Sequence, residues 1–309
     1  MSGWRAGLVA LALGGLILGA GAIVIAVGGG DEPPGTTATL APQDITLACV
    51  PALKAVCAEL GASLGAATQA FRPGTDPGGD VVVIAPQADL PAGMSGPVVA
   101  RSPIAVAVWR ERALILAAAC GGAIDLACLE DAYGRQWETL GGSAAWAGFK
   151  LGLADPTRSA SALEAWRAVA GSGVPAGLER SLRVQAADDA ALLLEVAQFG
   201  PSRADAVVAT EVAIAGQLEN VWDVGRLEVY YPDPGPWVEY VAAAGGSAAE
   251  RLAQRLASPE VQSQLAAWGL RPASGEAAGL PPGLGPAGQP LGPPSEAERA
   301  ALLAAWQDL

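Results

Sequence analysis

Short apolar runs rich in valine and alanine alternate with helix-type segments along most of this chain. The clearest runs are "DVVVIAP" at 80–86, "IAVAVW" at 104–109 and "ADAVVAT" at 204–210. Continuous apolar runs of this length are typical of strands whose two faces are both covered. Because these strands alternate with helical patterns, the sequence predicts an α/β fold with a mostly parallel sheet.

The predicted elements begin with a strand at 44–50 and a helix at 51–67, with Pro51 in the first helical turn. The long β-branched run at 96–109 is interrupted by Ser102-Pro103, which indicates a sheet edge or a crossing between two lobes. Further along the chain we expect strands at 78–87 and 149–156, a partly helical stretch at 120–142, a helix at 161–171, helix–turn–strand–helix within 188–216, extended segments within 226–244 and helices within 247–272.

The N-terminus carries an apolar stretch from Ala6 to Gly30 that contains no charged residue and no proline. About 20 such residues are enough for a helix to cross the hydrocarbon core of a bilayer. Arg5 precedes the stretch and acidic residues follow it, which favours an inside N-terminus and an extracytoplasmic body. We therefore predict an uncleaved single-pass anchor at 1–30 and a linker at 31–43, in the cell membrane. The alternative is a signal peptide cleaved near Ala20-Gly21-Ala22.

The four cysteines form two pairs, Cys49 with Cys57 and Cys120 with Cys128, each eight residues apart. An even number of cysteines in an exported chain predicts two short-range disulfides. Four buried free thiols are the alternative. Metal binding ranks third, because the chain has no CxxC spacing and no histidine.

Composition excludes several classes of function. The formal net charge is −13 with only 18 Lys plus Arg, so no basic surface for nucleic acid is expected. The absence of histidine removes Ser–His and Cys–His catalysis. Asp188 with Asp189, and Glu130 with Asp131, are adjacent carboxylates that would point about 100° apart on a helix. We interpret both pairs as solvated charges, so the sequence predicts no enzyme and no cofactor.

The composition changes after Pro272. Residues 273–294 are rich in proline and glycine, and we expect no packed structure there. Residues 295–309 then begin with Ser295 and Glu298, in the spacing of a capping box. The sequence thus predicts a short amphipathic helix on a tether.

The segment "LADPTRSASALEAW" at 153–166 places hydroxyl residues and an arginine where a helix begins. Ser161 and Glu164 have capping-box spacing, so ordinary helix capping is one interpretation. The other is a ligand site, because unpaired amides and the helix dipole at an N-terminus suit an oxyanion. In such α/β sheets ligands bind beyond the carboxyl ends of the strands.

In their order and in their residues, several segments resemble those of type II periplasmic solute-binding proteins, in particular the molybdate/sulfate-binding branch. They are "DVVVIAP", "RSPIAVAVWRERA", "LADPTRSASALEAW", "ADAVVATE", "LEVYYPDPGPWVEYV" and "LASPEVQSQLAAWGLRP". The resemblance extends to the solute-binding half of actinobacterial proteins that continue into a von Willebrand factor A domain. The C-terminal segment "LGPPSEAERAALLAAWQDL" resembles the connector between the two domains of those proteins.

The resemblance implies a two-lobed domain at 44–272, with lobe 1 at about 44–103 and 228–272 and lobe 2 at about 104–227. It implies a ligand site between the lobes and an ABC permease or a von Willebrand factor A-type protein as partner. The candidate ligand-binding residues are Gln87, Ser102, Thr157, Arg158, Ser159, Ser161, Thr210 and Tyr231.

Two functions follow from these observations. The first is a membrane-anchored extracytoplasmic protein that binds a small ligand, with anions among the candidates, for an importer or another membrane partner. The second is a protein-interaction module with a vestigial cleft. The absence of a hydroxyl residue directly after the first strand, at Ala48, Cys49 and Val50, favours the second.

Overall fold

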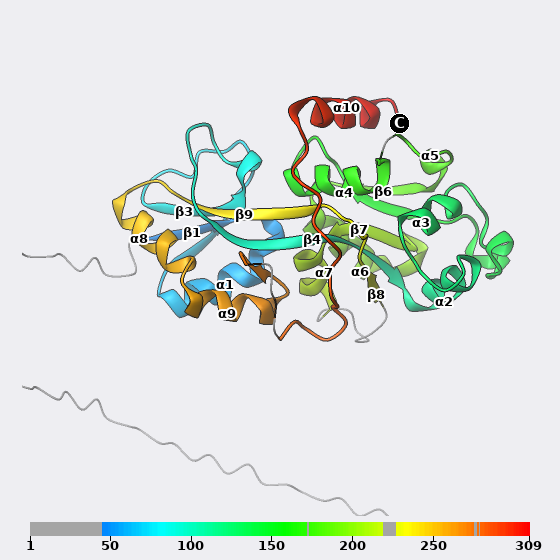
Figure 1. Cartoon of the computed structure of the whole chain (residues 1–309), viewed down its shortest axis with the longest axis horizontal. Helices are drawn as coiled ribbons and strands as arrows, with labels where there is room; N and C mark the ends of the chain where they lie inside the picture. The colour runs from blue at the N-terminus through cyan, green and yellow to red at the C-terminus, as the bar shows by residue number, and fades with distance from the viewer. Residues whose placement is uncertain (1–44, 172, 219–226, 275–276, 278) are drawn as a thin grey trace, which may run out of the picture. The chain divides into compact units, whose positions relative to one another are not determined.

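The computed structural model describes residues 45–171, 173–218, 227–274, 277 and 279–309 (Figure 1). The predicted anchor at 1–30 and the linker at 31–43 lie outside the described residues. Within the described ranges, no helix is both long and apolar enough to span a bilayer.

The described strands form one sheet in the order β2-β1-β3-β9-β4-β7-β5-β6, with β8 and β10 also paired to β4. The long strand β4 changes partner in its middle. Its residues 98–103 pair with β9, whereas Ile104 to Val108 pair with β7. The strands are β1 (Thr46–Cys49), β2 (Ala67–Ala70), β3 (Val81–Pro86), β4 (Val98–Trp109), β5 (Leu151–Ala154), β6 (Leu182–Ala186), β7 (Ala206–Thr210), β8 (Leu227–Tyr230), β9 (Trp237–Ala244) and β10 (Arg271–Pro272).

This change of partner divides the sheet into two halves. The first half contains β2, β1, β3, β9, β10 and residues 98–103 of β4; the second contains residues 104–109 of β4 with β7, β5, β6 and β8. Pro103 lies at the point of change, where the chain crosses between the halves. In Figure 1, β4 and β9 run side by side through the middle of the molecule.

The prediction of a mostly parallel sheet is wrong. The pairs β1–β2, β1–β3, β5–β6 and β5–β7 are parallel, but every pair formed by β4 or β9 is antiparallel. The reason is topological, since β4 and β9 carry the chain out of one half and back. The sheet is therefore mixed, with parallel strands at its two flanks.

The helices cover the sheet and begin or end where the sequence supplies a cap. Gly65, with φ of 69°, ends α1 before β2. Asp188 accepts a hydrogen bond from the Ala191 amide and caps α6. The helices are α1 (Lys54–Leu64), α2 (Arg110–Ala119), α3 (Leu126–Ala132), α4 (Ala160–Ala170), α5 (Leu178–Ser181), α6 (Asp189–Phe199), α7 (Glu211–Leu218), α8 (Ser247–Leu256), α9 (Pro259–Leu265) and α10 (Glu296–Gln307), with short 3-10 turns that include η3 (Gln87–Asp89).

The two predicted disulfides are confirmed. Cys49 at the end of β1 is bonded to Cys57 in α1, and Cys120 after α2 is bonded to Cys128 in α3. Each closes a short loop between consecutive elements. The first fixes the entry of α1 to the carboxyl end of β1, which is one wall of the site described below.

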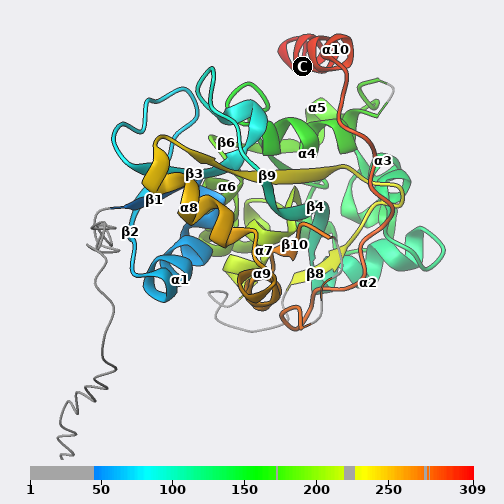
Figure 2. The same ribbon diagram turned by 60° about the vertical axis from the view of Figure 1, so that its left-hand side comes forward.

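The expectation that the Pro/Gly-rich segment has no packed structure is wrong for its C-terminal part. The amide of Leu291 donates to the Gly235 oxygen, and the Gly235 amide donates to the Gln289 oxygen. A side chain at Gly288 would collide with the Pro232 carbonyl oxygen, so only glycine permits this close approach. Both views show the segment crossing from the β8–β9 turn to α10, which lies beside α4 (Figures 1 and 2).

Candidate functional site

A cleft of about 910 Å³ opens where the carboxyl ends of β1, β3, β5 and β6 converge. Its walls come from both halves of the sheet, and α10 adds two residues at its rim. Lining residues include Val50, Arg72, Pro86, Asp89, Thr157, Arg158, Ser159, Ser161, Asp188, Asp189, Tyr240, Arg299 and Leu303. Ligand sites in α/β sheets form at this end of the strands, and the cleft is of the size that holds small molecules.

The start of α4 forms one wall of the cleft. Thr157, Arg158, Ser159 and Ser161 all line it. The helix cap, however, is Ser159 rather than Ser161: its hydroxyl accepts a hydrogen bond from the Ala162 amide at 3.2 Å. Ser161 lies in the first turn, with its hydroxyl 3.2 Å from that of Ser159. The predicted Ser161–Glu164 capping box is therefore wrong, and Glu164 pairs with Arg167 instead.

The N-terminus of α4 already holds a carboxylate of the chain itself. Asp89, in η3 of the first half, accepts a hydrogen bond from the Ala160 amide at 2.8 Å. Burial raises the pKa of Asp89 to about 6, although the Ala160 amide and Arg299 oppose the increase. Asp89 thus connects the two halves. It also occupies one of the α4 amides that we expected to bind an external oxyanion.

A second buried carboxylate lies in the cleft wall. Asp189 is fully buried, and its Oδ2 accepts hydrogen bonds from the Thr210 amide at 3.1 Å and hydroxyl at 2.8 Å. Its Oδ1 and the hydroxyl of Tyr240 have no hydrogen-bond partner of ordinary geometry within the described structure. The side chains of Ser161 and Thr210 nevertheless lie close enough to lower the pKa of Asp189 and of Tyr240, respectively. The interpretation of Asp189 as a solvated charge is wrong, because the residue directly after the Asp188 cap turns inward to β7. Burial raises the pKa of Asp189.

The other predicted ligand residues do not line this cleft. The buried Ser102 hydroxyl accepts from the Val212 amide at 3.0 Å, and Thr210 is bonded to Asp189 behind the wall. Tyr231 donates its hydroxyl to Glu211 at 2.5 Å. Gln87 is exposed and donates to the Met94 oxygen. Sequence reasoning missed Asp89, Tyr240 and Arg299, for which the order of strands gave no signal.

The titration of Asp89 gives the first testable prediction. Its pKa of about 6 lies above the ordinary 3.8, so between these values the folded state keeps a proton that the unfolded state has lost. By linkage, the Asp89 contribution to the free energy of unfolding falls as the pH rises from about 4 to about 6. Asp89→Asn removes this contribution. Urea denaturation at about pH 4 and about pH 7 should therefore show a different pH dependence for this variant than for wild type.

The control for this experiment is Asp131→Asn, at an exposed position on α3. It should follow the wild-type pH dependence. If Asp89→Asn follows wild type as well, the buried carboxyl does not hold its proton as stated. Burial also raises the pKa of Asp189, so Asp189 changes the free energy of unfolding with pH in the same direction. It is present in both wild type and Asp89→Asn, so it does not account for a difference between them.

Among the residues that the structure describes, no three His, Cys, Asp or Glu side chains are grouped so that they could hold an ion. The cleft offers carboxylates, hydroxyls and guanidinium groups instead. Such groups bind a polar solute by hydrogen bonds and charge.

An α/β fold with a strand exchange in the middle of the sheet and a cleft between its halves defines a periplasmic-binding-protein type II fold. Residues 86–271 match the family of bacterial extracellular solute-binding proteins, and the chain belongs to this family. It is therefore an extracytoplasmic protein that binds a small ligand and is not an enzyme. No curated protein is significantly similar to it in sequence.

The solved structures to which the chain is similar have low sequence identity to it. The periplasmic binding protein P5PA is 14% identical with a TM-score of 0.48, over 85% of this chain and 98% of that one. A Bordetella ferric binding protein is 13% identical with a TM-score of 0.43, over 86% and 96%. An ABC-type phosphate transport receptor from Vibrio cholerae is 8% identical with a TM-score of 0.40, over 74% and 99%.

Proposed function

We propose that this protein is a membrane-held receptor that binds a small polar solute in the cleft and presents it to a membrane partner. The observation that carries the proposal is the cleft itself, at the convergence of four strand ends in a chain of the solute-binding family. The two halves of the sheet would act as lobes, with the crossing of β4 and β9 as the hinge.

The proposed mode of attachment and the proposed partner are those expected from the sequence. The uncharged stretch 6–30 would hold the body at the outer face of the membrane. An ABC-type permease is the partner expected for a solute receptor that delivers its ligand. Arg158, exposed at the rim, and the hydroxyls of Thr157, Ser159 and Ser161 would contact the solute.

A second function is supported by one observation. The chain fills part of its own site, because Asp89 takes the Ala160 amide and α10 places Arg299 and Leu303 on the cleft. An interaction module that has lost its solute would tolerate such self-occupation. Its partner would be a protein, with the von Willebrand factor A type suggested by the sequence resemblance.

Native mass spectrometry of the full chain in detergent separates the two functions. A receptor should retain a small mass that is released on unfolding. Ala88→Trp places a large side chain on the cleft wall and should abolish retention, whereas Ala58→Trp, exposed on α1, should not. A clean apo mass, together with no thermal shift across anions, amino acids and sugars, would contradict the receptor and favour the interaction module.

A further inference from the structure

The C-terminal helix α10 packs against α4 and contributes residues to the cleft lining. Trp166 of α4 donates its indole N–H to the Leu302 oxygen at 2.7 Å, and its ring packs edge-on against Trp306 at 5.2 Å. Leu302 is buried. Arg167 of α4 donates to Glu298 at 2.8 Å and to the Gly292 oxygen at 2.7 Å. These contacts fix α10 along the helix whose N-terminus forms the cleft wall.

This docking brings Arg299 to the cleft, from a segment outside the family-matched residues 86–271. Arg299 is half-buried and close enough to Asp89 to stabilise its negative charge. Yet Arg299 forms no ion pair with Asp89 or with any other described residue. Opposite charges therefore face the same space without contacting each other.

The deeper wall is acidic and has unused hydrogen-bonding capacity. Asp89 is 8% exposed, Asp189 is 0% exposed, and neither has a cationic partner among the described side chains. The Oδ1 of Asp189 and the hydroxyl of Tyr240 are buried in the lining without partners. Buried polar groups of this kind are normally satisfied, so these atoms point to a missing hydrogen-bond partner.

The rim has the opposite character. Arg72 and Arg158 are exposed there, and neither forms an ion pair with a described residue. A simple anion would satisfy the arginines but would be repelled by the two buried carboxylates, and the Ala160 amide is already taken by Asp89. A simple cation would satisfy the carboxylates but would be repelled by the arginines.

We propose that the cleft binds a small zwitterionic solute of the α-amino-acid type, with Arg299 of α10 as a ligand-binding residue. Its ammonium group faces Asp89 and the unpartnered oxygens of Asp189 and Tyr240. Its carboxylate faces Arg299, with Arg158 and Arg72 at the rim. The solute thus bridges charges that lie near each other but do not contact, and charge-assisted hydrogen bonds at both ends give it orientation. This inference rests on the proposed receptor function.

The test is calorimetry on the full chain in detergent, after removal of any retained solute by mild unfolding and refolding with the disulfides intact. The probes are a set of α-amino acids, and for each the matched amine without the carboxylate and the matched acid without the ammonium group. We expect an amino acid to bind at least tenfold more tightly than either matched analogue. Arg299→Ala and Asp89→Asn should each weaken it at least tenfold.

Matched controls separate binding from folding. Arg251→Ala, at an exposed position on α8, and Asp131→Asn remove the same charges elsewhere and should leave affinity unchanged. The Asn variant keeps an oxygen that can accept from the Ala160 amide. If sulfate or a matched acid binds as tightly as any amino acid, or if Arg299→Ala has no effect, the inference is overturned and the receptor stands. If the protein binds no small molecule, both fail.

Discussion

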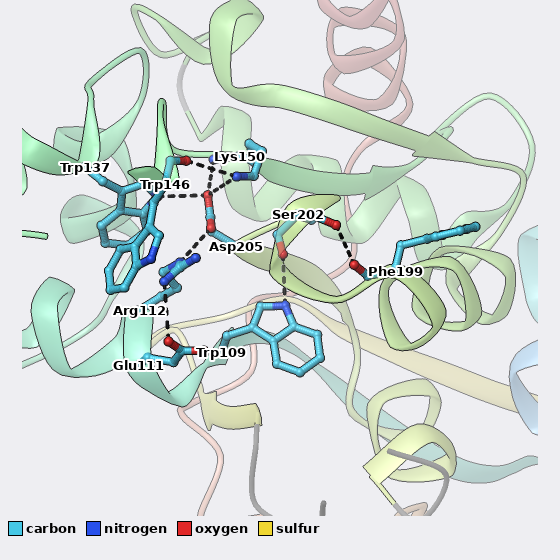
Figure 3. A network of polar contacts seen from close by, with 10 residues as sticks. Trp109, Glu111, Arg112, Trp137, Trp146, Lys150, Phe199, Ser202 and Asp205 are labelled. Atoms are coloured by element: carbon cyan, nitrogen blue, oxygen red, sulfur yellow. Dashed lines mark hydrogen bonds and ion pairs between the residues drawn. The ribbon is translucent and has the colours of Figure 1, made fainter. Parts of the chain in front are cut away.

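Replacement of Asp205 by alanine is expected to lower the free energy of unfolding by about 3–5 kcal/mol, as for other broken buried ion pairs. Asp205 is 0% exposed and joins several elements of the second half (Figure 3). Its Oδ1 accepts from Arg112 Nε at 3.0 Å. Its Oδ2 accepts from Trp137 Nε1 at 3.0 Å and from the Lys150 amide at 2.8 Å.

The large effect arises from the groups that would lose their partner. Arg112 is only 5% exposed, and its guanidinium carbon lies 3.4 Å from the centre of the Trp146 ring. Without Asp205 this charge stays buried, and its remaining ion pair is with the exposed Glu111 at 3.7 Å. The Trp137 indole N–H, in a fully buried ring, would also be unsatisfied. Each loss leaves a desolvated polar group without compensation.

Urea denaturation with the disulfides intact, followed by tryptophan fluorescence, measures the effect. Asp131→Ala, at an exposed position, is the matched control and should change stability by no more than about 0.5 kcal/mol. Asp205→Asn keeps the shape and one acceptor, so an intermediate loss is expected. A loss below about 1 kcal/mol for Asp205→Ala would show that Arg112 finds water or another acceptor.

The central strands could be predicted from the sequence because burial on both faces leaves an unbroken apolar run. The residues of β3 from Val81 to Pro86 are all buried, as are those of β7. The edge strands β2 and β6 were missed for the same reason. Ala67 to Ala70 of β2 are all exposed, so neither alternation nor an apolar run distinguishes this strand from a loop.

The candidate site could be predicted only where it is local in the chain. Residues 157–161 stand together at a strand–helix turn, and the structure places them on the cleft. Asp89, Tyr240 and Arg299 reach the same cleft from η3, β9 and α10. Their convergence depends on the antiparallel crossing of β4 and β9 and on the docking of α10. Neither has a signature in residue spacing, and the Pro/Gly composition of 273–294 indicated a free tether.

Loss of the ion pair between Glu211 and Arg271 is the other change with a large expected effect on the free energy of unfolding. Arg271 of β10 donates to Glu211 at the start of α7 through Nε at 2.9 Å and Nη2 at 2.6 Å. The two side chains are 6% and 0% exposed, and Tyr231 donates a third hydrogen bond to Glu211. Glu211→Ala leaves the arginine charge buried, so a loss of about 3–5 kcal/mol is expected in urea denaturation.

The double variant Glu211→Leu/Arg271→Met tests whether this loss comes from the uncompensated charge. Removal of both charges leaves neither one buried alone. The double variant should therefore lose less stability than the sum of the losses of the two single variants. Arg101→Met/Glu239→Leu, a partly exposed pair between β4 and β9, is the control and should be nearly additive. Additive losses at Glu211 and Arg271 would contradict the role of charge.

The consequence of this ion pair reaches beyond stability, because it lies at the junction of three parts of the fold. β10 pairs with β4 in the first half, Glu211 follows β7 in the second, and Arg271 also donates to the Gly285 oxygen at 2.7 Å. Arg271→Met should therefore release the C-terminal segment as well. Hydrogen exchange measured by mass spectrometry should increase at Gly285, Gln289 and Leu291, whose amides donate to Tyr231, Asp233 and Gly235, respectively. If exchange there stays at the wild-type rate while stability falls, the segment is held by its contacts with α4 and the turn alone. Arg271 would then join the two halves without controlling the helix that carries Arg299.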